Sequence, residues 1–194
     1  MKILLMGNPN VGKSVIFSRL TGIHVIASNY PGTTVSYTRG FMRLGEEKVE
    51  IIDVPGTYTL EPSSQAEQIA LQMLETVDVV INVIDATKLE RNLYLTLQLL
   101  EKNIPVIIAL NMWDDTKHHG ISIDVDRLKN TVNENWNLFN NDNGKKISDD
   151  DVLFIDERTD DYIKLVEEEL AQNQGNVKVS IAFDEDEEIN VDDI

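Results

Sequence analysis

The sequence predicts an α/β fold with a six-stranded, mostly parallel β-sheet and helices on both faces. Short apolar runs alternate with helical patterns along the chain, which is typical of a mostly parallel sheet covered on both sides. A glycine-rich turn separates the first apolar run from the first helical pattern, as expected of a strand–turn–helix unit. Both observations point to the same fold class.

The glycine-rich turn fits the phosphate-loop pattern G-x-x-x-x-G-K-[ST] with the residues Gly7-Asn8-Pro9-Asn10-Val11-Gly12-Lys13-Ser14. Residues 3–6 before it predict a buried strand. The helix predicted after it has one apolar face, formed by Val15, Ile16, Phe17 and Leu20. Backbone N–H groups in such a turn, together with the positive end of the helix dipole, bind a phosphate. Lys13 can reach the outer phosphates and the Ser14 hydroxyl can bind Mg²⁺.

The segments after the first helix continue the alternation. Residues 22–34 lack helical periodicity and contain an Asn-Tyr-Pro-Gly run, so we predict a loop there. A capping box that begins at Ser64 predicts the start of a helix, and regularly spaced leucines predict another at residues 89–100. Strands are predicted at residues 35–43, 48–53, 77–84 and 104–110, the first two joined as a hairpin.

The last third of the chain has a weaker pattern. The expected elements are a helix at 124–138, a loop at 140–151, a sixth strand at 152–155, a closing helix at 159–172 and an edge strand at 177–183. We therefore predict one domain over residues 1–172 and an acidic extension over residues 173–194.

Charge and composition exclude several classes of partner. Residues 1–123 contain 10 Lys and Arg against 13 Asp and Glu, whereas residues 124–194 contain 7 against 21, and the whole chain has a net charge of −17. Such an acidic field repels nucleic acid and anionic lipid, and we find no basic patch to oppose it. The chain has no cysteine, so disulfides and thiolate metal sites are excluded.

Three further motifs follow predicted strands or lie in the loop beside them. The run Asp53-Val54-Pro55-Gly56 ends a strand, so Asp53 can support Mg²⁺ through water and the Gly56 N–H can meet a terminal phosphate. A hydroxyl of Thr33 or Thr34, in the loop after the first helix, can complete the metal shell. Alone, each motif is also compatible with an ordinary polar turn.

The run Asn111-Met112-Trp113-Asp114 indicates which base the bound nucleotide carries. An aspartate after a buried strand can accept hydrogen bonds from the N1–H and the exocyclic amine of guanine, whereas adenine offers no such donor pair. A buried acceptor left unpaired costs ~1–3 kcal/mol. This motif therefore takes the prediction from a nucleotide to a guanine nucleotide.

With these motifs the chain resembles a translation-factor-class GTPase domain, and most of all the amino-terminal G domain of the FeoB family of bacterial ferrous iron transporters. The resemblance covers about residues 1–128. It rests on the motifs above and on the runs Asn29-Tyr30-Pro31-Gly32-Thr33-Thr34-Val35, Asp53-Val54-Pro55-Gly56-Thr57-Tyr58 and Gly120-Ile121-Ser122-Ile123-Asp124. It implies a Ras-like P-loop GTPase fold and a GTP-hydrolysing domain that regulates Fe²⁺ uptake.

The resemblance also implies a role for each matching residue. Lys13 holds the β- and γ-phosphates, while Ser14 and Thr34 bind Mg²⁺. Asp53 supports the metal and Gly56 senses the γ-phosphate. The full set implied to contact the nucleotide is Gly7, Asn8, Pro9, Asn10, Val11, Gly12, Lys13, Ser14, Gly32, Thr33, Thr34, Asp53, Val54, Pro55, Gly56, Asn111, Met112, Trp113 and Asp114.

A potassium ion is implied at Asn10, where it would neutralise charge that develops on the phosphates in place of an arginine finger. Thr57 stands where Ras-type enzymes have a glutamine that orients water, so slow basal hydrolysis is expected. The residues implied in catalysis are Asn10, Lys13, Thr34 and Gly56. The implied location is the cytoplasmic side of the bacterial inner membrane, with a membrane-embedded permease portion as partner, and the oligomeric state stays open.

One segment departs from the family pattern. After the predicted sixth strand, relatives have a small Ser-Ala type motif that contacts guanine, whereas this chain has Asp156-Glu157-Arg158-Thr159. A module that binds nucleotide without turnover is therefore one alternative. The other is a free-standing GTPase of ribosome assembly or tRNA modification, which the acidic last third disfavours.

Overall fold

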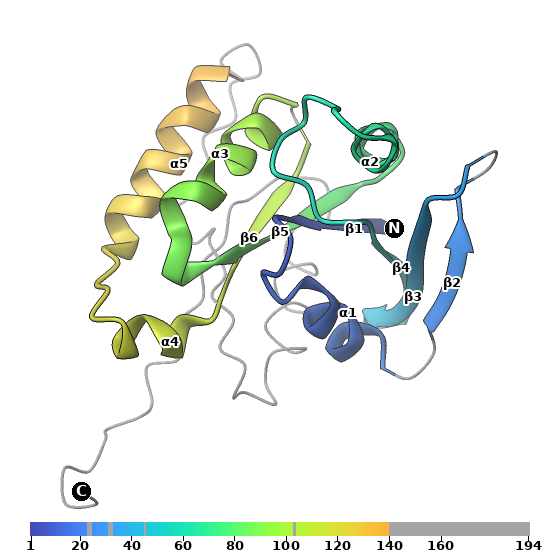
Figure 1. The fold of residues 1–194 in the computed structure, drawn as a ribbon, viewed down its shortest axis with the longest axis horizontal. Coiled ribbons are helices and arrows are strands. Elements are labelled where there is room, and N and C mark those ends of the chain that lie inside the picture. The colour runs from blue at the N-terminus through green and yellow to red at the C-terminus, as the bar shows by residue number, and fades with distance from the viewer. Residues whose placement is uncertain (23–24, 31–32, 45, 103, 140–194) are drawn as a thin grey trace, which may run out of the picture.

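A computed structural model of the chain describes residues 1–22, 25–30, 33–44, 46–102 and 104–139. Figure 1 shows the arrangement of the elements in this part of the chain. The strands are β1 (Lys2–Gly7), β2 (Val25–Asn29), β3 (Ser36–Leu44), β4 (Glu47–Asp53), β5 (Val79–Asp85) and β6 (Val106–Asn111). The helices are α1 (Lys13–Thr21), α2 (Gln65–Leu74), α3 (Leu89–Leu100), α4 (Trp113–His118) and α5 (Val125–Phe139), with a 3-10 turn η1 (Ala86–Lys88) before α3.

The six strands form one sheet in the order β2-β3-β4-β1-β5-β6. β1 pairs in parallel with β4 and β5, and β5 pairs in parallel with β6. The hairpin of β3 and β4 is antiparallel, as predicted, and β2 adds a second antiparallel pairing at the edge. The sheet is therefore mixed, with its parallel strands at the centre, and the predicted fold class is confirmed.

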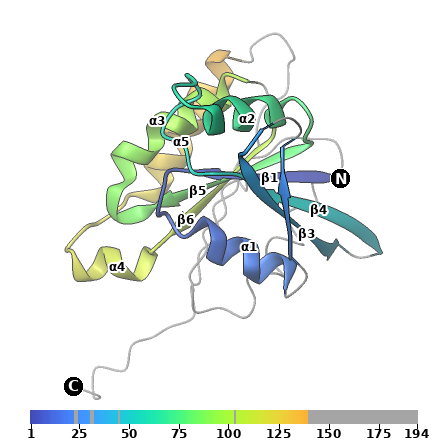
Figure 2. The ribbon, with the colours of Figure 1, turned by 45° about the vertical axis from the view of Figure 1, so that its right-hand side comes forward.

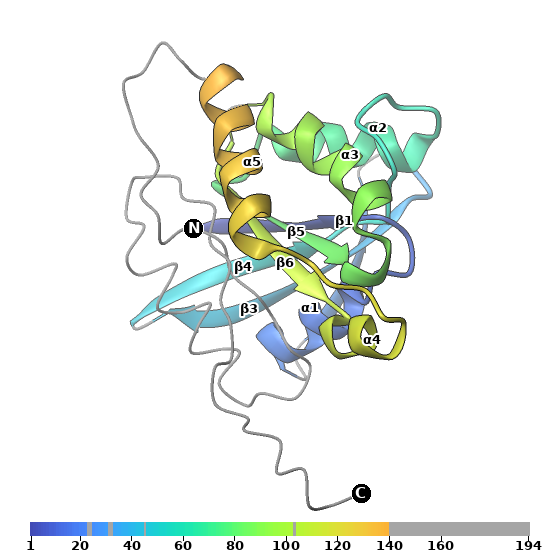
Figure 3. The same cartoon turned by 90° about the vertical axis from the view of Figure 1, so that its left-hand side faces the viewer.

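Helices cover both faces of the sheet (Figures 2 and 3). Alternate residues of the central strands point to opposite faces, as the pleat requires. On one face, Leu4 and Met6 of β1 pack in a core with buried residues of α2, α3 and α5. On the other face, Ile3 and Leu5 pack in a second core with buried residues of α1. The central strands are thus apolar on both sides, which explains their continuous hydrophobic runs.

The capping box predicted at Ser64 is present. The Ser64 hydroxyl accepts a hydrogen bond from the Glu67 N–H at 3.2 Å, and the Glu67 carboxylate accepts one from the Ser64 N–H at 3.0 Å. This arrangement pairs two N–H groups at the start of α2. The helix predicted at 124–138 is also confirmed, as α5.

Two sequence predictions are wrong, and one helix was not predicted. Residues 25–29 form β2, although residues 22–34 were expected to be a loop. Val15 is 46% exposed, so it does not belong to the buried face of α1. Residues 113–118 form the short helix α4, which was not expected. Several predicted features lie outside the described residues, namely the loop at 140–151, the strand at 152–155, the helix at 159–172, the edge strand at 177–183 and the domain boundary at residue 172.

In the described part of the chain, none of the helices is long and apolar enough to cross a membrane.

Candidate functional site

The loop between β1 and α1 needs glycine at two positions. At Gly7, a Cβ atom would collide with the carbonyl oxygen of Val83, because β5 lies directly beside the end of β1. At Gly12, φ is +83° and a Cβ atom would collide with the Asn111 side chain. Gly12 is the N-cap of α1, and no side chain caps this helix end. The first N–H groups of α1 therefore remain available to an anion.

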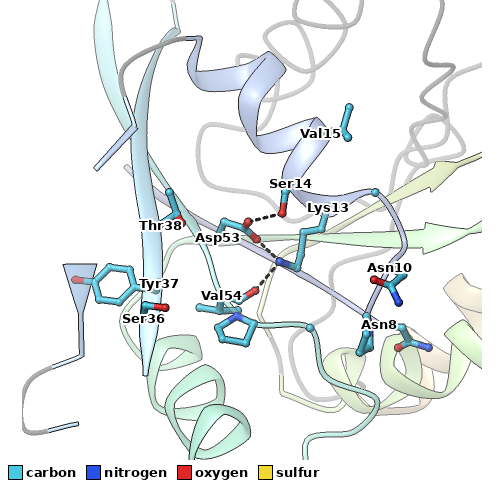
Figure 4. A pocket seen from close by; sticks show the side chains of 14 residues that line it. Asn8, Asn10, Lys13, Ser14, Val15, Ser36, Tyr37, Thr38, Asp53 and Val54 are labelled. Carbon is cyan, nitrogen blue, oxygen red and sulfur yellow. Dashed lines mark hydrogen bonds and ion pairs between the residues drawn. The ribbon is translucent and has the colours of Figure 1, made fainter. Parts of the chain in front are cut away.

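A pocket of about 500 Å³ opens at this helix end (Figure 4). It lies where β1 and β4, which are parallel neighbours, both end. Its lining comes from three segments: the loop and first turn of α1, the start of β3, and the end of β4 with the residues that follow. The lining residues are Asn8, Pro9, Asn10, Gly12, Lys13, Ser14, Val15, Ser36, Tyr37, Thr38, Asp53, Val54, Pro55 and Gly56.

Charged and hydroxyl groups converge inside the pocket, as Figure 4 shows. The Lys13 ammonium forms an ion pair with the Asp53 carboxylate and donates a hydrogen bond to the Val54 carbonyl. The Ser14 hydroxyl donates to the other Asp53 oxygen at 3.2 Å. The Lys13 and Asp53 side chains are each about nine-tenths buried. Their opposite charges compensate each other, which a buried charge requires.

Gly56 lies against the phosphate loop. A Cβ atom at Gly56 would be 2.8 Å from both Cα and N of Pro9 and 3.1 Å from the carbonyl carbon of Asn8. The next residue, Thr57, donates its backbone N–H to the Gly7 carbonyl at 3.1 Å. The segment after β4 is thereby joined to the loop after β1, although about fifty residues separate them in the sequence.

Asn111, the first residue of the motif that ends at Asp114, connects this motif to the phosphate loop. Its side-chain amide, fully buried, donates a hydrogen bond to the Val11 carbonyl at 2.9 Å. Met112 has φ +60° and is the N-cap of α4, so the chain turns sharply there. Asp114 then lies in the first turn of α4, half-buried, and it does not line the pocket in the described residues. The pocket thus covers the predicted phosphate side of the site, with Asn111 as its link to the predicted base side.

Among the motif residues of the site, two buried side-chain oxygens lack a hydrogen-bond partner in the described part of the chain. They are Oδ1 of Asn8, which lines the pocket, and Oδ1 of Asn111. Buried polar atoms are normally paired, so these acceptors are suited to a ligand or an ordered water.

The two threonines of the loop before β3 do not line the pocket. The Thr33 hydroxyl donates to the Tyr30 carbonyl at 3.0 Å and accepts the Val35 N–H at 3.2 Å. Thr34 is exposed, and neither threonine is among the described residues that line the pocket. Gly32 lies outside the described residues. The structure therefore does not bring Thr34 together with Ser14 and Asp53.

The sequence analysis missed three residues of β3 that line the pocket, namely Ser36, Tyr37 and Thr38. Thr38 reaches it because it pairs directly with Asp53 in the antiparallel ladder. The hairpin predicted from the sequence places this strand next to β4, but it does not fix the register that brings Thr38 opposite Asp53.

Glu67 connects the segment after Gly56 to the start of α2. Its carboxylate accepts hydrogen bonds from the Ser63 hydroxyl at 2.6 Å and the Ser63 N–H at 2.8 Å, and the Thr57 hydroxyl lies 3.3 Å away. The bonds from Ser63, with smaller ones from Ser64, outweigh the effect of burial and lower the pKa of Glu67 below its ordinary value.

The donor set fits a phosphorylated ligand with a hard cation. Lys13 and the uncapped end of α1 suit phosphate oxygens. The Ser14 hydroxyl and the Asp53 carboxylate, which already contact each other, are the oxygen ligands that Mg²⁺ prefers. Asn10, with φ +63° at the pocket rim, carries an amide oxygen that suits a monovalent cation.

Comparison with known proteins shows the family of the chain. Residues 1–149 match the family model described as ferrous iron transport protein B. The chain is 50% identical over 135 residues to the Fe(2+) transporter FeoB of Legionella pneumophila (strain Lens), over 66% of this chain and 18% of that protein. It is 48% identical over 131 residues to an Fe(2+) transport protein A/FeoB fusion protein of Porphyromonas gingivalis, over 66% of this chain and 16% of that protein.

Solved structures agree. The cytosolic domain of L. pneumophila FeoB matches with a TM-score of 0.75 and 38% identity, over 95% of this chain and 73% of that chain. A GDP-bound mutant of the S. thermophilus FeoB G-domain matches with a TM-score of 0.73 and 34% identity, over 92% of this chain and 65% of that chain. The chain spans less than a fifth of the length of the two curated relatives. It belongs to the ferrous iron transport protein B family, to the part that forms the amino-terminal G domain.

Proposed function

We propose that this domain binds GTP with Mg²⁺, hydrolyses it slowly, and thereby regulates a ferrous iron transporter. The observation that carries the proposal is the convergence of Lys13, Ser14 and Asp53 in one pocket at the uncapped end of α1. Such a convergence after two parallel strands is the phosphate and metal site of P-loop nucleotide hydrolases.

The chemistry follows from these side chains. Lys13 leaves Asp53 and Val54 when phosphate oxygens replace them as its partners, so its positive charge is always compensated. Released from Lys13, the Asp53 carboxylate can support the metal beside the Ser14 hydroxyl. Mg²⁺ supplies charge neutralisation on the β- and γ-phosphate oxygens. The Gly56 N–H, next to the loop, donates to the γ-phosphate.

Thr34 completes the site in the GTP state. Because Thr34 does not line the pocket in this structure, it has to move inward when GTP binds. Ordering of a loop by a γ-phosphate, and its release after hydrolysis, is the usual switch of GTPases. Water is positioned by backbone groups of this loop, because Thr57 has no side chain that reaches as far as a glutamine.

Guanine is read by Asp114, and Asn111 holds the reading motif against the phosphate loop. Support comes from the S. thermophilus FeoB G-domain, which is GDP-bound in its solved structure. Residues 156–159, which replace the family's Ser-Ala type motif, lie outside the described residues.

Asn10 would hold a potassium ion, which would supply positive charge that accelerates hydrolysis. Asn10 lies at the rim of the pocket, where its amide oxygen and the phosphates would share the ion (Figure 4). A cation there provides the positive charge that an arginine finger supplies in other GTPases.

The regulated partner is the membrane-embedded permease portion of a transporter for Fe²⁺. Support comes from the relatives named Fe(2+) transporter FeoB, of which this chain matches a small part. The domain would act at the cytoplasmic side of the bacterial inner membrane.

The proposal is tested by phosphate release from GTP in potassium and in sodium buffer. We expect slow turnover that rises in potassium, loses this rise in Asn10→Ala and disappears in Lys13→Ala. Absence of turnover in both buffers, with GDP bound tightly, would favour the non-catalytic module instead. Equal rates in the two buffers would remove the potassium ion from the account.

A further inference from the structure

Besides the contact between Thr57 and Glu67, the five residues after Gly56 are tied to the rest of the domain at three points. We call residues 57–61 the strap. At its start, the Thr57 N–H donates to the Gly7 carbonyl at 3.1 Å. In its middle, the Tyr58 ring lies 4.5 Å from the Arg91 guanidinium. At Leu60, the backbone N–H donates to Oε1 of Gln98 at 2.7 Å. Two of these three points lie on α3.

The contact at Leu60 is the most specific of the three. The Leu60 side chain is buried in the core that α2 and α3 share, so this part of the strap cannot turn toward water without exposing it. Its N–H has to find an acceptor inside the protein, because a buried N–H left unpaired is costly. Gln98, 38 residues away on α3 and half-buried, supplies that acceptor.

The strap fixes the place of Gly56. Gly56 packs against Pro9 with no room for a Cβ atom, and Thr57 holds the next residue on the phosphate loop. Leu60 is four residues from Gly56, and each residue between them has two freely rotating backbone bonds, so an anchored Leu60 restricts a segment that would otherwise be loose. Anchoring at both ends therefore holds the Gly56 N–H at the pocket before any γ-phosphate arrives.

We propose that Gln98 is a positioning residue for the γ-phosphate: it anchors the strap on α3 and so presets the Gly56 N–H at the pocket. This inference rests on the proposed function, because it concerns the same nucleotide site. Gln98 does not line the pocket, so its effect passes through Leu60 and the strap.

The test compares two substitutions of Gln98. Gln98→Met keeps the length of the side chain and the helix propensity of α3 but removes the acceptor. Gln98→Glu, the matched control, keeps an oxygen acceptor in the same place. The readouts are hydrogen exchange of the Leu60 amide, and the affinities for GDP and for a non-hydrolysable GTP analogue by calorimetry with Mg²⁺.

In Gln98→Met we expect the Leu60 amide to exchange roughly threefold to tenfold faster, since one hydrogen bond is lost. The ratio of analogue affinity to GDP affinity should fall by a similar factor, while GDP affinity stays within about twofold. Gln98→Glu should restore both values. A general loss of stability would lower the affinities for both nucleotides together and leave their ratio unchanged.

Two results would overturn the inference alone: Leu60 exchange in Gln98→Met equal to the wild type, or faster exchange with an unchanged affinity ratio. Wild-type protein that binds neither nucleotide would overturn the proposed function and, with it, the role of Gln98. The wild-type arm therefore separates the two failures.

Discussion

Replacement of Gly56 by alanine should slow turnover without weakening GDP binding. The added Cβ atom would lie 2.8 Å from Cα and N of Pro9, whereas ordinary contact begins at 3.4 Å. Both neighbours are backbone atoms, so Gly56 must retreat by about 0.6 Å or more, which is the difference between the two distances. Its N–H then moves away from the position of the γ-phosphate.

The size of the effect follows from the hydrogen bond that is lost. A hydrogen bond to a charged group contributes about 1.5–3 kcal/mol. Each 1.36 kcal/mol changes a rate tenfold, so kcat should fall roughly tenfold to a hundredfold. GDP lacks the γ-phosphate, and its affinity should stay within about twofold. Phosphate release and calorimetry with GDP measure the two quantities.

Gly120→Ala is the matched control. Its φ is +64°, so alanine is strained there, but a Cβ atom would meet nothing within 4 Å. The cost is about 1–2 kcal/mol of folding stability at a residue that does not line the pocket, and turnover should match the wild type. Normal turnover in Gly56→Ala, or a parallel loss of GDP affinity, would refute the close packing of Gly56 on the phosphate loop.

Three further predictions concern hydrogen bonds of side chains inside the domain. Asn111→Ala removes the donor to the Val11 carbonyl, so the free energy of GDP binding, measured by calorimetry, should weaken by about 1 kcal/mol or more. An unchanged affinity would count against the role of this hydrogen bond in holding the site. Thr96→Val leaves the buried Asn82 amide without its acceptor at 2.7 Å, so the free energy of unfolding, measured in urea, should fall by about 1–3 kcal/mol. An unchanged free energy of unfolding would contradict this prediction. The pKa of Glu67 is lowered, so the carboxylate stabilises the folded state above pH 4.5, and this stabilisation is lost as the pH falls through the lower pKa of the folded protein. The difference in Tm between wild type and Glu67→Gln should therefore shrink in acid. A difference that stays constant with pH would exclude this role of Glu67.

The central strands and most helices could be predicted because their patterns are local. β1, β5 and β6 are buried on both faces and are mostly apolar, with Asn82 as the polar interruption in β5, and the capping box marks the start of α2. β2 was not predicted because it is an edge strand with one neighbour, and its Ile26 is 45% exposed. Its sequence therefore shows no alternation of core-facing apolar side chains. α4 escaped because six mostly polar residues are too few to show a helical period.

The same division holds for the site. The phosphate loop could be predicted because Gly7, Gly12 and Lys13 act within one short segment. The place of Thr38 depends on the register between β3 and β4, and the anchor at Gln98 depends on how α3 packs against the strap. Both are contacts between segments distant in sequence, and no local pattern encodes them.

The central claim is that the pocket at the start of α1 takes a guanine nucleotide whose base is read through Asp114. Calorimetry of the purified protein with GDP and with ADP, in the presence of Mg²⁺, tests it most directly. We expect GDP to bind roughly tenfold to a hundredfold more tightly, since adenine would leave the Asp114 acceptor unpaired. Equal affinities for the two nucleotides would contradict the claim.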